Sequence, residues 1–297
     1  MRNTPGAIVC AIVLAASSSA ASAQDAQDLP LRVKSGDRLA IEYSHERHEN
    51  GQAKTGNIVA EILIGDVSDD GFAATWTTQS VEVDGYLIDA NSPEAADILL
   101  GVPIKYVASL DGAPIRISDR DRLLETMLNG PLFAQQPEEA TESLRALMNS
   151  MSDDSLAALF LQVPTYMSLC QGMRLIPGEP FEYTAEVQSP VGGEPADAVV
   201  SYMLETFDRQ SGQAHIEYRS ELDPEGAKQM VLTLLEQIDT GFEPDQSEID
   251  AVTIERKDTA SCDIDIESGW VESMTVQSVR KVAGQFRSET FVISTSR

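Results

Sequence analysis

The residue types that most often carry chemistry are few in this chain, and their spacing fits known signatures only in part. His45-Glu46-Arg47-His48 is one residue shorter than the zinc signature H-E-x-x-H. Residues three apart on a strand point to opposite faces, so His45 and His48 are not expected to share a metal. The third histidine, His215, has no sequence neighbour that would make it a general base. We therefore predict neither a metal site nor a zinc enzyme.

Other catalytic signatures fail on order or surroundings. Lys54-Thr55-Gly56 and Ser278-Val279-Arg280-Lys281 match two elements of penicillin-recognising enzymes, but in reversed order, and Ser278 falls on a predicted strand. The two glycines Gly51 and Gly56 lack the Lys and the Ser or Thr that a phosphate loop needs. A G-x-S-x-G elbow is absent from the sequence. We expect no catalytic residue, no cofactor and a protein that is not an enzyme.

Carboxylates are abundant, and Asp263, Asp265 and Glu267 alternate along one predicted strand. Alternation places them on one face, where they could loosely hold calcium, but the loop pattern D-x-[DN]-x-[DN]-G is missing. A water-exposed strand face is the favoured interpretation. An exported hydrolase that uses distant carboxylates stays open as a less favoured alternative, because separation in space is invisible in sequence.

The first 23 residues have the layout of a secretory signal peptide. Arg2 precedes an apolar run over residues 7–16, and Ala21-Ser22-Ala23 forms a small-residue cleavage site. We expect cleavage after Ala23 and a periplasmic or secreted protein. The apolar run is shorter than the roughly 20 residues of a membrane-spanning helix, and no later stretch predicts a transmembrane span. In an oxidising compartment, Cys170 and Cys262 are expected to form a disulfide.

The charge balance is strongly acidic. The chain has 21 Lys and Arg against 48 Asp and Glu, a formal net charge of −27. Such a charge opposes binding to nucleic acid and to anionic lipid headgroups, since both need clustered Lys and Arg. We therefore expect no nucleic-acid partner and attribute the acidity to solubility.

Period-two patterns predict an antiparallel sheet. In residues 214–221, apolar or small residues alternate with His215, Glu217, Arg219 and Glu221, which is typical of a sheet with one covered and one wet face. Residues 271–295 predict a long hairpin that turns near Ala283-Gly284. Helix starts are expected at Ser118 or Asp119, at Pro137 and at Ser152. Residues 156–170 are apolar but interrupted by Gln162, Pro164, Thr165 and Ser168, and predict a buried helix pair or a kinked helix.

The predicted fold class is α+β, with a curved antiparallel sheet, or a pair of sheets, around a central helical block. We expect a signal peptide over 1–23, an N-terminal sheet half over 24–130, a helical block over 131–176 and a C-terminal sheet half over 177–297. Both halves contain strands, a helix that begins with Pro-Glu at Pro93 or Pro224, and further strands. This order is compatible with an internal duplication and equally with convergence.

The apolar stripe over residues 156–170 follows helical spacing and is typical of core packing. The functional alternative is that the helices leave part of a curved sheet uncovered and so form an apolar pocket. The residues expected to line it are Trp76, Phe160, Tyr166, Met203 and Phe207.

A family resemblance rests on the export signal, the alternation of long strands with short helices, and the segment Leu110-Asp111-Gly112-Ala113-Pro114-Ile115-Arg116-Ile117-Ser118-Asp119-Arg120-Asp121. Together they resemble uncharacterised periplasmic proteins of proteobacteria, whose architecture is similar to the half-barrel carriers of the lipoprotein-localisation family. The resemblance implies a curved sheet that holds acyl chains under a helical lid. It contains no diagnostic motif, so it transfers no binding residue. The expected function is non-enzymatic binding of a lipid, another hydrophobic ligand or an envelope component; the alternative is an envelope protein–protein interaction module.

Overall fold

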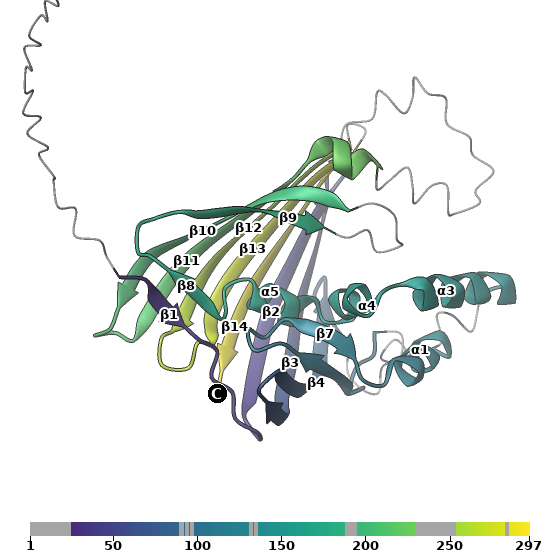
Figure 1. The fold of residues 1–297 in the computed structure, drawn as a ribbon. Helices are drawn as coiled ribbons and strands as arrows, with labels where there is room; N and C mark the ends of the chain where they lie inside the picture. The colour runs from purple at the N-terminus through teal and green to yellow at the C-terminus, as the bar shows by residue number, and fades with distance from the viewer. Residues whose placement is uncertain are drawn as a thin grey trace, which may run out of the picture.

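The computed structural model describes residues 25–297 except 89–91, 93–94, 96–97, 131–132, 134–135, 188–194, 230–253 and 283–284. The expected signal peptide therefore lies outside the described residues. Most of the described chain forms one open, curved antiparallel sheet of 12 strands (Figure 1). The predicted curved antiparallel sheet is confirmed, whereas helices make up a smaller share than a central block implies.

The strands follow one another mainly as antiparallel hairpins. Those of the first half are β2 (Arg38–Glu49), β3 (Gln52–Ser68), β4 (Gly71–Val83), β5 (Tyr86–Ile88), β6 (Ile104–Ala108) and β7 (Pro114–Ile117). Those of the second half are β9 (Phe181–Val187), β10 (Ala196–Asp208), β11 (Gln213–Leu222), β12 (Ile254–Asp265), β13 (Val271–Val282) and β14 (Gln285–Ser296). A separate two-stranded sheet pairs β1 (Gln27–Leu29) with β8 (Met173–Leu175).

The two halves belong to one continuous sheet because β14 pairs with β2. The order across the sheet is β7-β6-β4-β3-β2-β14-β13-β12-β11-β10-β9, with β5 beside β4. Ile41 of β2 and Ile293 of β14 are both fully buried near this junction. Of the two expected arrangements, a single curved sheet or a pair of sheets, the chain adopts the single sheet.

Local turn chemistry explains the hairpins. Asn50 and Gly51 both have positive φ angles, 51° and 79°, between β2 and β3. Two such residues in succession suit a type I′ turn, whose twist matches that of the flanking strands. The long hairpin predicted over 271–295 is confirmed as β13 and β14, and its two turn residues lie outside the described part of the chain.

The helices of the described chain include α1 (Arg120–Leu128), α3 (Glu138–Ser150), α4 (Asp153–Phe160) and α5 (Gln162–Ser168), and residues 224–229 are also helical, as expected from Pro224. The predicted starts at Asp119, Pro137 and Ser152 are confirmed, and the Ser152 hydroxyl accepts a hydrogen bond from the backbone N–H of Ser155. Of the two arrangements expected for residues 156–170, the helix pair is confirmed: α4 and α5 are separate helices, and the break between them falls at Leu161. Pro164 lies in the first turn of α5, where a missing N–H costs no helical hydrogen bond.

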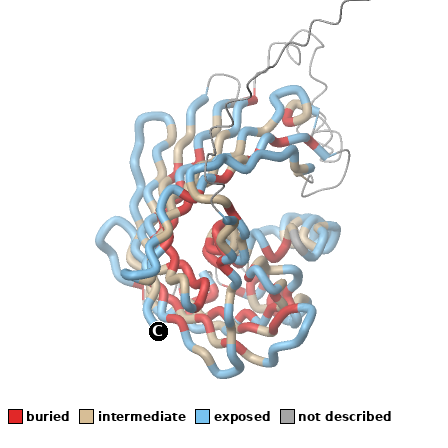
Figure 2. Tube along the Cα trace, turned by 60° about the vertical axis from the view of Figure 1, so that its left-hand side comes forward, coloured by how far each residue is buried: buried red, intermediate tan, exposed pale blue. Residues whose placement is uncertain are grey.

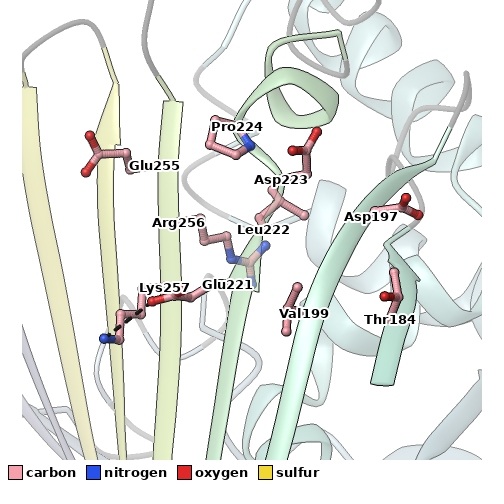
Figure 3. A pocket seen from close by; sticks show the side chains of 10 residues that line it. All are labelled: Thr184, Asp197, Val199, Glu221, Leu222, Asp223, Pro224, Glu255, Arg256 and Lys257. Carbon is pink, nitrogen blue, oxygen red and sulfur yellow. Dashed lines mark ion pairs between the residues drawn. The ribbon is translucent and has the colours of Figure 1, made fainter. Parts of the chain in front are cut away.

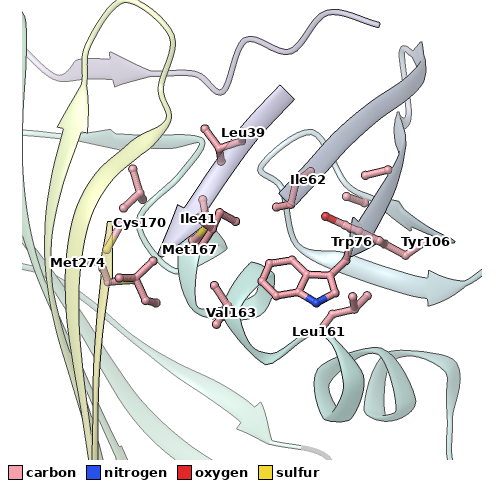
Figure 4. Close-up of a cluster of buried hydrophobic side chains, with 14 of the residues drawn as sticks. Leu39, Ile41, Ile62, Trp76, Tyr106, Leu161, Val163, Met167, Cys170 and Met274 are labelled. Carbon is pink, nitrogen blue, oxygen red and sulfur yellow. The ribbon is translucent and has the colours of Figure 1, made fainter. Parts of the chain in front are cut away.

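The core lies between α4, α5 and the inner face of the sheet (Figures 2 and 4). Figure 4 shows Trp76 beside Leu161, and Met167 beside Ile41. The remaining cavity among Ile62, Phe72, Tyr106 and Met167 is only about 10 Å³. The helices therefore fill this part of the curve.

The predicted disulfide between Cys170 and Cys262 is confirmed. It ties the residues that follow α5 to strand β12, and both cysteines are fully buried. The helices of the described residues are all too short or too polar to cross a membrane.

Candidate ligand-binding face

Side-chain alternation gives the curved sheet an inner face, which bears the core, and a wetter outer face (Figure 2). Away from the helices, the inner face of β9, β10 and β11 carries four aromatic rings. We call Phe181, Tyr183, Tyr202 and Tyr218 the aromatic row. Phe181, Tyr202 and Tyr218 lie directly opposite one another across the three strands, and Tyr183 follows on β9.

The rings of the aromatic row are close enough to contact one another. The ring centroids of Phe181 and Tyr183 are 5.6 Å apart, those of Tyr183 and Tyr202 are 6.5 Å apart, and those of Tyr202 and Tyr218 are 5.1 Å apart. Phe181 is 54% exposed and Tyr183 is 42% exposed, whereas Tyr202 is buried. Burial, with Tyr183 and Tyr218 nearby, raises the pKa of Tyr202, so its hydroxyl stays neutral. The row offers apolar surface to a binding partner.

Three arginines face one another farther along the inner face. Arg256 of β12 lies opposite Arg280 of β13, which lies opposite Arg287 of β14. We call these three residues the arginine ladder. Their side chains are 42%, 38% and 32% exposed, in that order. Like charges placed directly opposite on neighbouring strands destabilise a sheet, so this arrangement requires compensation.

Two carboxylates compensate the arginine ladder in part. Asp258 accepts a hydrogen bond from Arg256 Nε at 2.8 Å. Glu289 accepts one from Arg287 Nη2 at 2.6 Å, and its other oxygen lies 4.0 Å from Arg280 Nη2. The His45 imidazole and the guanidinium groups of Arg287 and Arg280 lower the pKa of Glu289 to about 2, against the opposing effect of burial. On β2, Glu49 lies opposite Arg287 and pairs with Arg47, so this part of the described chain holds four guanidinium groups and three carboxylates.

Several buried polar atoms in and beside the arginine ladder have no hydrogen-bond partner among the described residues. Ser278 is 2% exposed, lies opposite Glu289, and its Oγ has no hydrogen-bond partner among the described residues. The Nε atoms of Arg280 and Arg287 are likewise buried and unpartnered within the described chain. Because buried polar groups are normally paired, an inner-face region with several unpaired groups is where a further polar partner fits.

Helix α5 borders this polar region. The Tyr166 ring lies 5.0 Å from the ring of Phe291, which stacks at 4.2 Å on His45. Gln162 Nε2 donates to the Tyr166 hydroxyl oxygen at 2.9 Å. The covered core and the arginine-bearing end of the inner face therefore meet at α5.

The five expected lining residues occupy different environments. Trp76 is 5% exposed and belongs to the packed core. Phe160 and Phe207 are half-buried and pack against that core, as does Tyr166. Met203 is exposed on the outer face, since it alternates with the buried Tyr202 and Leu204. The structure thus places Tyr166 beside the inner polar region and Met203 on the opposite side of the sheet.

The aromatic row and the arginine ladder were missed by sequence reasoning. Alternation in residues 214–221 already put Tyr218 on the covered side, and Arg280 was considered only as part of a catalytic motif. The hairpin predicted to turn near Ala283-Gly284 already implies that Arg280 lies opposite Arg287. The position of Arg256 and the alignment of the aromatic row depend on the register of further strands, which no local pattern states. The signal that could have been used is the aromatic content of 181–183 and 202, read with the same period of two.

A surface pocket of about 570 Å³ lies near the ends of β9 to β12 (Figure 3). Its lining includes the carboxylates of Asp197, Glu221, Asp223 and Glu255. The row Thr184, Val199, Glu221 and Lys257 runs across it on the outer face, with an ion pair of 3.5 Å between Lys257 and Glu221. Arg256 of the arginine ladder and Lys257 also line the pocket. A lining with this many charged groups does not suit an apolar ligand, so we place the candidate site on the inner face.

Comparison with known proteins gives weak similarities only. No protein-family model matches the sequence, and no curated protein matches it. A chain from a structure of lipid–protein interactions in lipovitellin matches 89% of this chain at 11% identity, with a TM-score of 0.47. The match covers 25% of the lipovitellin chain, so this protein spans about a quarter of its length. A domain from Vibrio parahaemolyticus, described as an outer membrane lipoprotein-sorting protein, matches 90% of this chain and 86% of its own length at 10% identity and a TM-score of 0.23.

Proposed function

We propose that the inner face of the curved sheet binds an amphipathic ligand of the lipid class. Its apolar part lies on the aromatic row, and its acidic group lies on the arginine ladder. The observation that carries the proposal is the ladder itself: Arg256, Arg280 and Arg287 stand in direct register in a protein whose formal net charge is −27. Repulsion among them is relieved when a carboxylate or phosphate binds.

The apolar part of the proposal rests on exposed aromatic area. An aromatic side chain can bury about 150–250 Å² on contact, and burial of each CH₂ of a chain contributes about 0.8 kcal/mol. Phe181 and Tyr183 retain enough exposure to receive such a chain, the half-buried Tyr218 extends the surface on β11, and the buried Tyr202 packs between them.

The acidic part of the proposal differs from the expectation drawn from composition. The overall charge predicts poor binding to anionic headgroups, since clustered bases are needed. The strand register supplies that cluster on one face: the β13–β14 hairpin pairs Arg280 with Arg287, and β12 adds Arg256. Guanidinium groups recognise carboxylates and phosphates in a bidentate way, so a local cluster can prevail over a distant, screened excess of negative charge.

We propose a binding protein and not a hydrolase. Asp263 is held by Ser273 and His215, and Asp265 is held by Ser268 and Arg297; these contacts lower both carboxyl pKa values against the effect of burial. A general acid needs a raised pKa, so these two residues are poorly suited to that role. We also propose that the protein acts outside the cytoplasm, which the Cys170–Cys262 disulfide supports.

A second candidate function is protein–protein interaction in the envelope. Strand β9 stands at the end of the sheet order, and its Phe181 and Tyr183 are exposed. A partner could add a strand to this edge, with main-chain hydrogen bonds and aromatic contacts. This candidate uses the same residues of β9 but makes no use of the arginine ladder.

The test is native mass spectrometry of the protein purified from its own compartment, followed by organic extraction and displacement of a fluorescent fatty acid. We expect a stoichiometric adduct that the solvent removes, and displacement by unlabelled fatty acid. Absence of both the adduct and any fatty-acid binding would reject the proposal. Crosslinking through β9 to another protein would then favour the second candidate.

A further inference from the structure

His215 lies on the outer face, where β10, β11 and β12 run side by side, and it is separate from the proposed ligand-binding face. No residue next to it in the sequence suggests a role. The register supplies its surroundings: His215 lies opposite Asp263, and Glu217 lies opposite Ser261. The histidine is therefore surrounded by acidic and hydroxyl groups from neighbouring strands.

A β-bulge brings a further carboxylate to the same place. The pairing of β10 with β11 shifts between Leu204 and Thr206, so Glu205 is the extra residue of the bulge. Its Oε2 lies 3.9 Å from His215 Nε2, and Glu217 Oε1 lies 3.0 Å from the same nitrogen. Bulges re-aim side chains and often accompany functional sites.

We propose that His215, Glu205 and Glu217 form a binding site for a divalent transition-metal cation, with Zn²⁺ as the best fit. One ligand atom from each residue lies within 4.8 Å of the others. Tetrahedral Zn²⁺ with bonds of about 2.1 Å places its ligands about 3.4 Å apart. The existing separations bracket that value, and Glu205 is half-exposed at the bulge and free to close the difference.

Asp263 orients the imidazole for this role. Its Oδ1 lies 2.8 Å from His215 Nδ1, and its Oδ2 accepts a hydrogen bond of 2.6 Å from Ser273 Oγ. A carboxylate at Nδ1 favours the tautomer that keeps the proton there and leaves the Nε2 lone pair for the metal. Metal-binding histidines commonly have such a carboxylate behind them. The fourth position is open to water next to Ser261, whose Oγ is 3.2 Å from Nε2.

The same residues also stand in the order Ser261, His215, Asp263 of a hydrolase triad, but two observations oppose that role. Glu217 is closer to Nε2 than Ser261 is, so the imidazole does not face the hydroxyl alone. The paired register of β11 and β12 continues through this region, so its backbone N–H groups serve the sheet and not an oxyanion hole.

The experiment is a Zn²⁺ titration of the full chain by calorimetry after chelator treatment, with visible spectra of the Co²⁺ form. We expect one tight site with the spectrum of tetrahedral Co²⁺. His215→Gln should weaken Zn²⁺ binding at least tenfold, and Glu205→Gln should weaken it similarly. The second variant guards against a folding defect, since it changes an exposed side chain at the bulge.

The matched control is His48→Gln. His48 is an exposed strand histidine whose Nε2 lies 2.7 Å from Glu46, so it offers one histidine and one carboxylate without the bulge. Its loss should leave Zn²⁺ affinity unchanged, and excess Ca²⁺ should not displace Zn²⁺. The proposal is overturned if folded His215→Gln and Glu205→Gln bind Zn²⁺ as the unaltered protein does, if His48→Gln weakens binding equally, or if Ca²⁺ displaces the metal.

Discussion

Glu289 keeps its negative charge inside the sheet because basic groups surround it on the inner face. Its folded pKa of about 2 lies below the ordinary 4.5, so its ionised form stabilises the fold above about pH 4.5. That contribution is lost as the pH falls through 4.5 toward 2. We expect Glu289→Gln to lower the free energy of unfolding by about 1.5–3 kcal/mol at pH 7, because the charge-assisted hydrogen bond with the partly exposed Arg287 is lost.

Urea unfolding of Glu289→Gln and the unaltered protein at several pH values measures this difference. The difference in free energy of unfolding between the two proteins should shrink steadily as the pH falls from 4.5 to 2. Glu46→Gln, which changes a half-exposed carboxylate, should show little gap at any pH. A gap for Glu289→Gln that does not depend on pH would show that the carboxylate charge is not what stabilises this region.

Arg280 and Lys281 are neighbours in sequence and offer a matched pair for the proposed ligand-binding face. Arg280 is the middle member of the ladder, whereas Lys281 points to the other face and pairs with Glu255 at 3.2 Å. We expect Arg280→Gln to weaken fatty-acid binding about tenfold, since a charge-assisted hydrogen bond contributes about 1.5–3 kcal/mol. Lys281→Gln should leave it unchanged. Displacement of a fluorescent fatty acid measures both.

The same pair of variants distinguishes recognition of an acidic headgroup from general hydrophobic binding of the acyl chain. A neutral monoacylglycerol of the same chain length should bind Arg280→Gln as well as it binds the unaltered protein. Equal losses for the acid and the neutral lipid, or equal losses for Arg280→Gln and Lys281→Gln, would contradict a specific role for the ladder.

Among the elements, the residues that follow α5 are tied to β12 by a covalent link. The Cys170–Cys262 bridge encloses a sequence separation of 92 residues. On the chain-entropy description, a loop of this size contributes about 4.6 kcal/mol by restricting the unfolded chain. We expect the double variant Cys170→Ala, Cys262→Ala to lose about that amount in urea unfolding. Reduction of the unaltered protein should give a similar loss; a change below about 1 kcal/mol in both would contradict this account.

Elements governed by local chemistry could be predicted from the sequence, and those governed by register could not. The start of α4 at Ser152 follows from capping, and the β13–β14 hairpin follows from alternation around a turn. The outer placement of Met203 follows from the alternation of buried and exposed residues along β10, a pattern of period two. The β2–β14 junction joins residues as far apart as Glu42 and Ser294, a separation of 252, and no local signal encodes it.

The site residues show the same division. The faces of Tyr218 and His215 could be predicted from alternation in a single strand. The arginine ladder needed the relative register of three strands, because a slip of one residue would send Arg280 to the outer face. The carboxylate of Glu205 reaches His215 only through a bulge, which the sequence of β10 does not announce.

At the scale of the whole molecule, the β2–β14 junction decides whether the two halves unfold together. Each strand of this junction is paired on both sides, β2 with β3 and β14 with β13, and the junction contributes Ile41, Phe291 and Ile293 to the buried core. The halves therefore share their hydrophobic interior, and neither can bury its inner face alone. We expect a single cooperative unfolding transition in calorimetry.

Hydrogen exchange tests the same point strand by strand. Amides of β2 and β14 should exchange only with global unfolding, whereas those of β7 and β9, at the two ends of the sheet order, should exchange faster because each lacks a second neighbouring strand in the described sheet. Two calorimetric transitions, or fast exchange along β2 and β14, would mean that the halves are separate folding units. In that case the junction would be a docking surface between domains, and the arginine ladder, which lies on β12, β13 and β14, would persist in the second half alone.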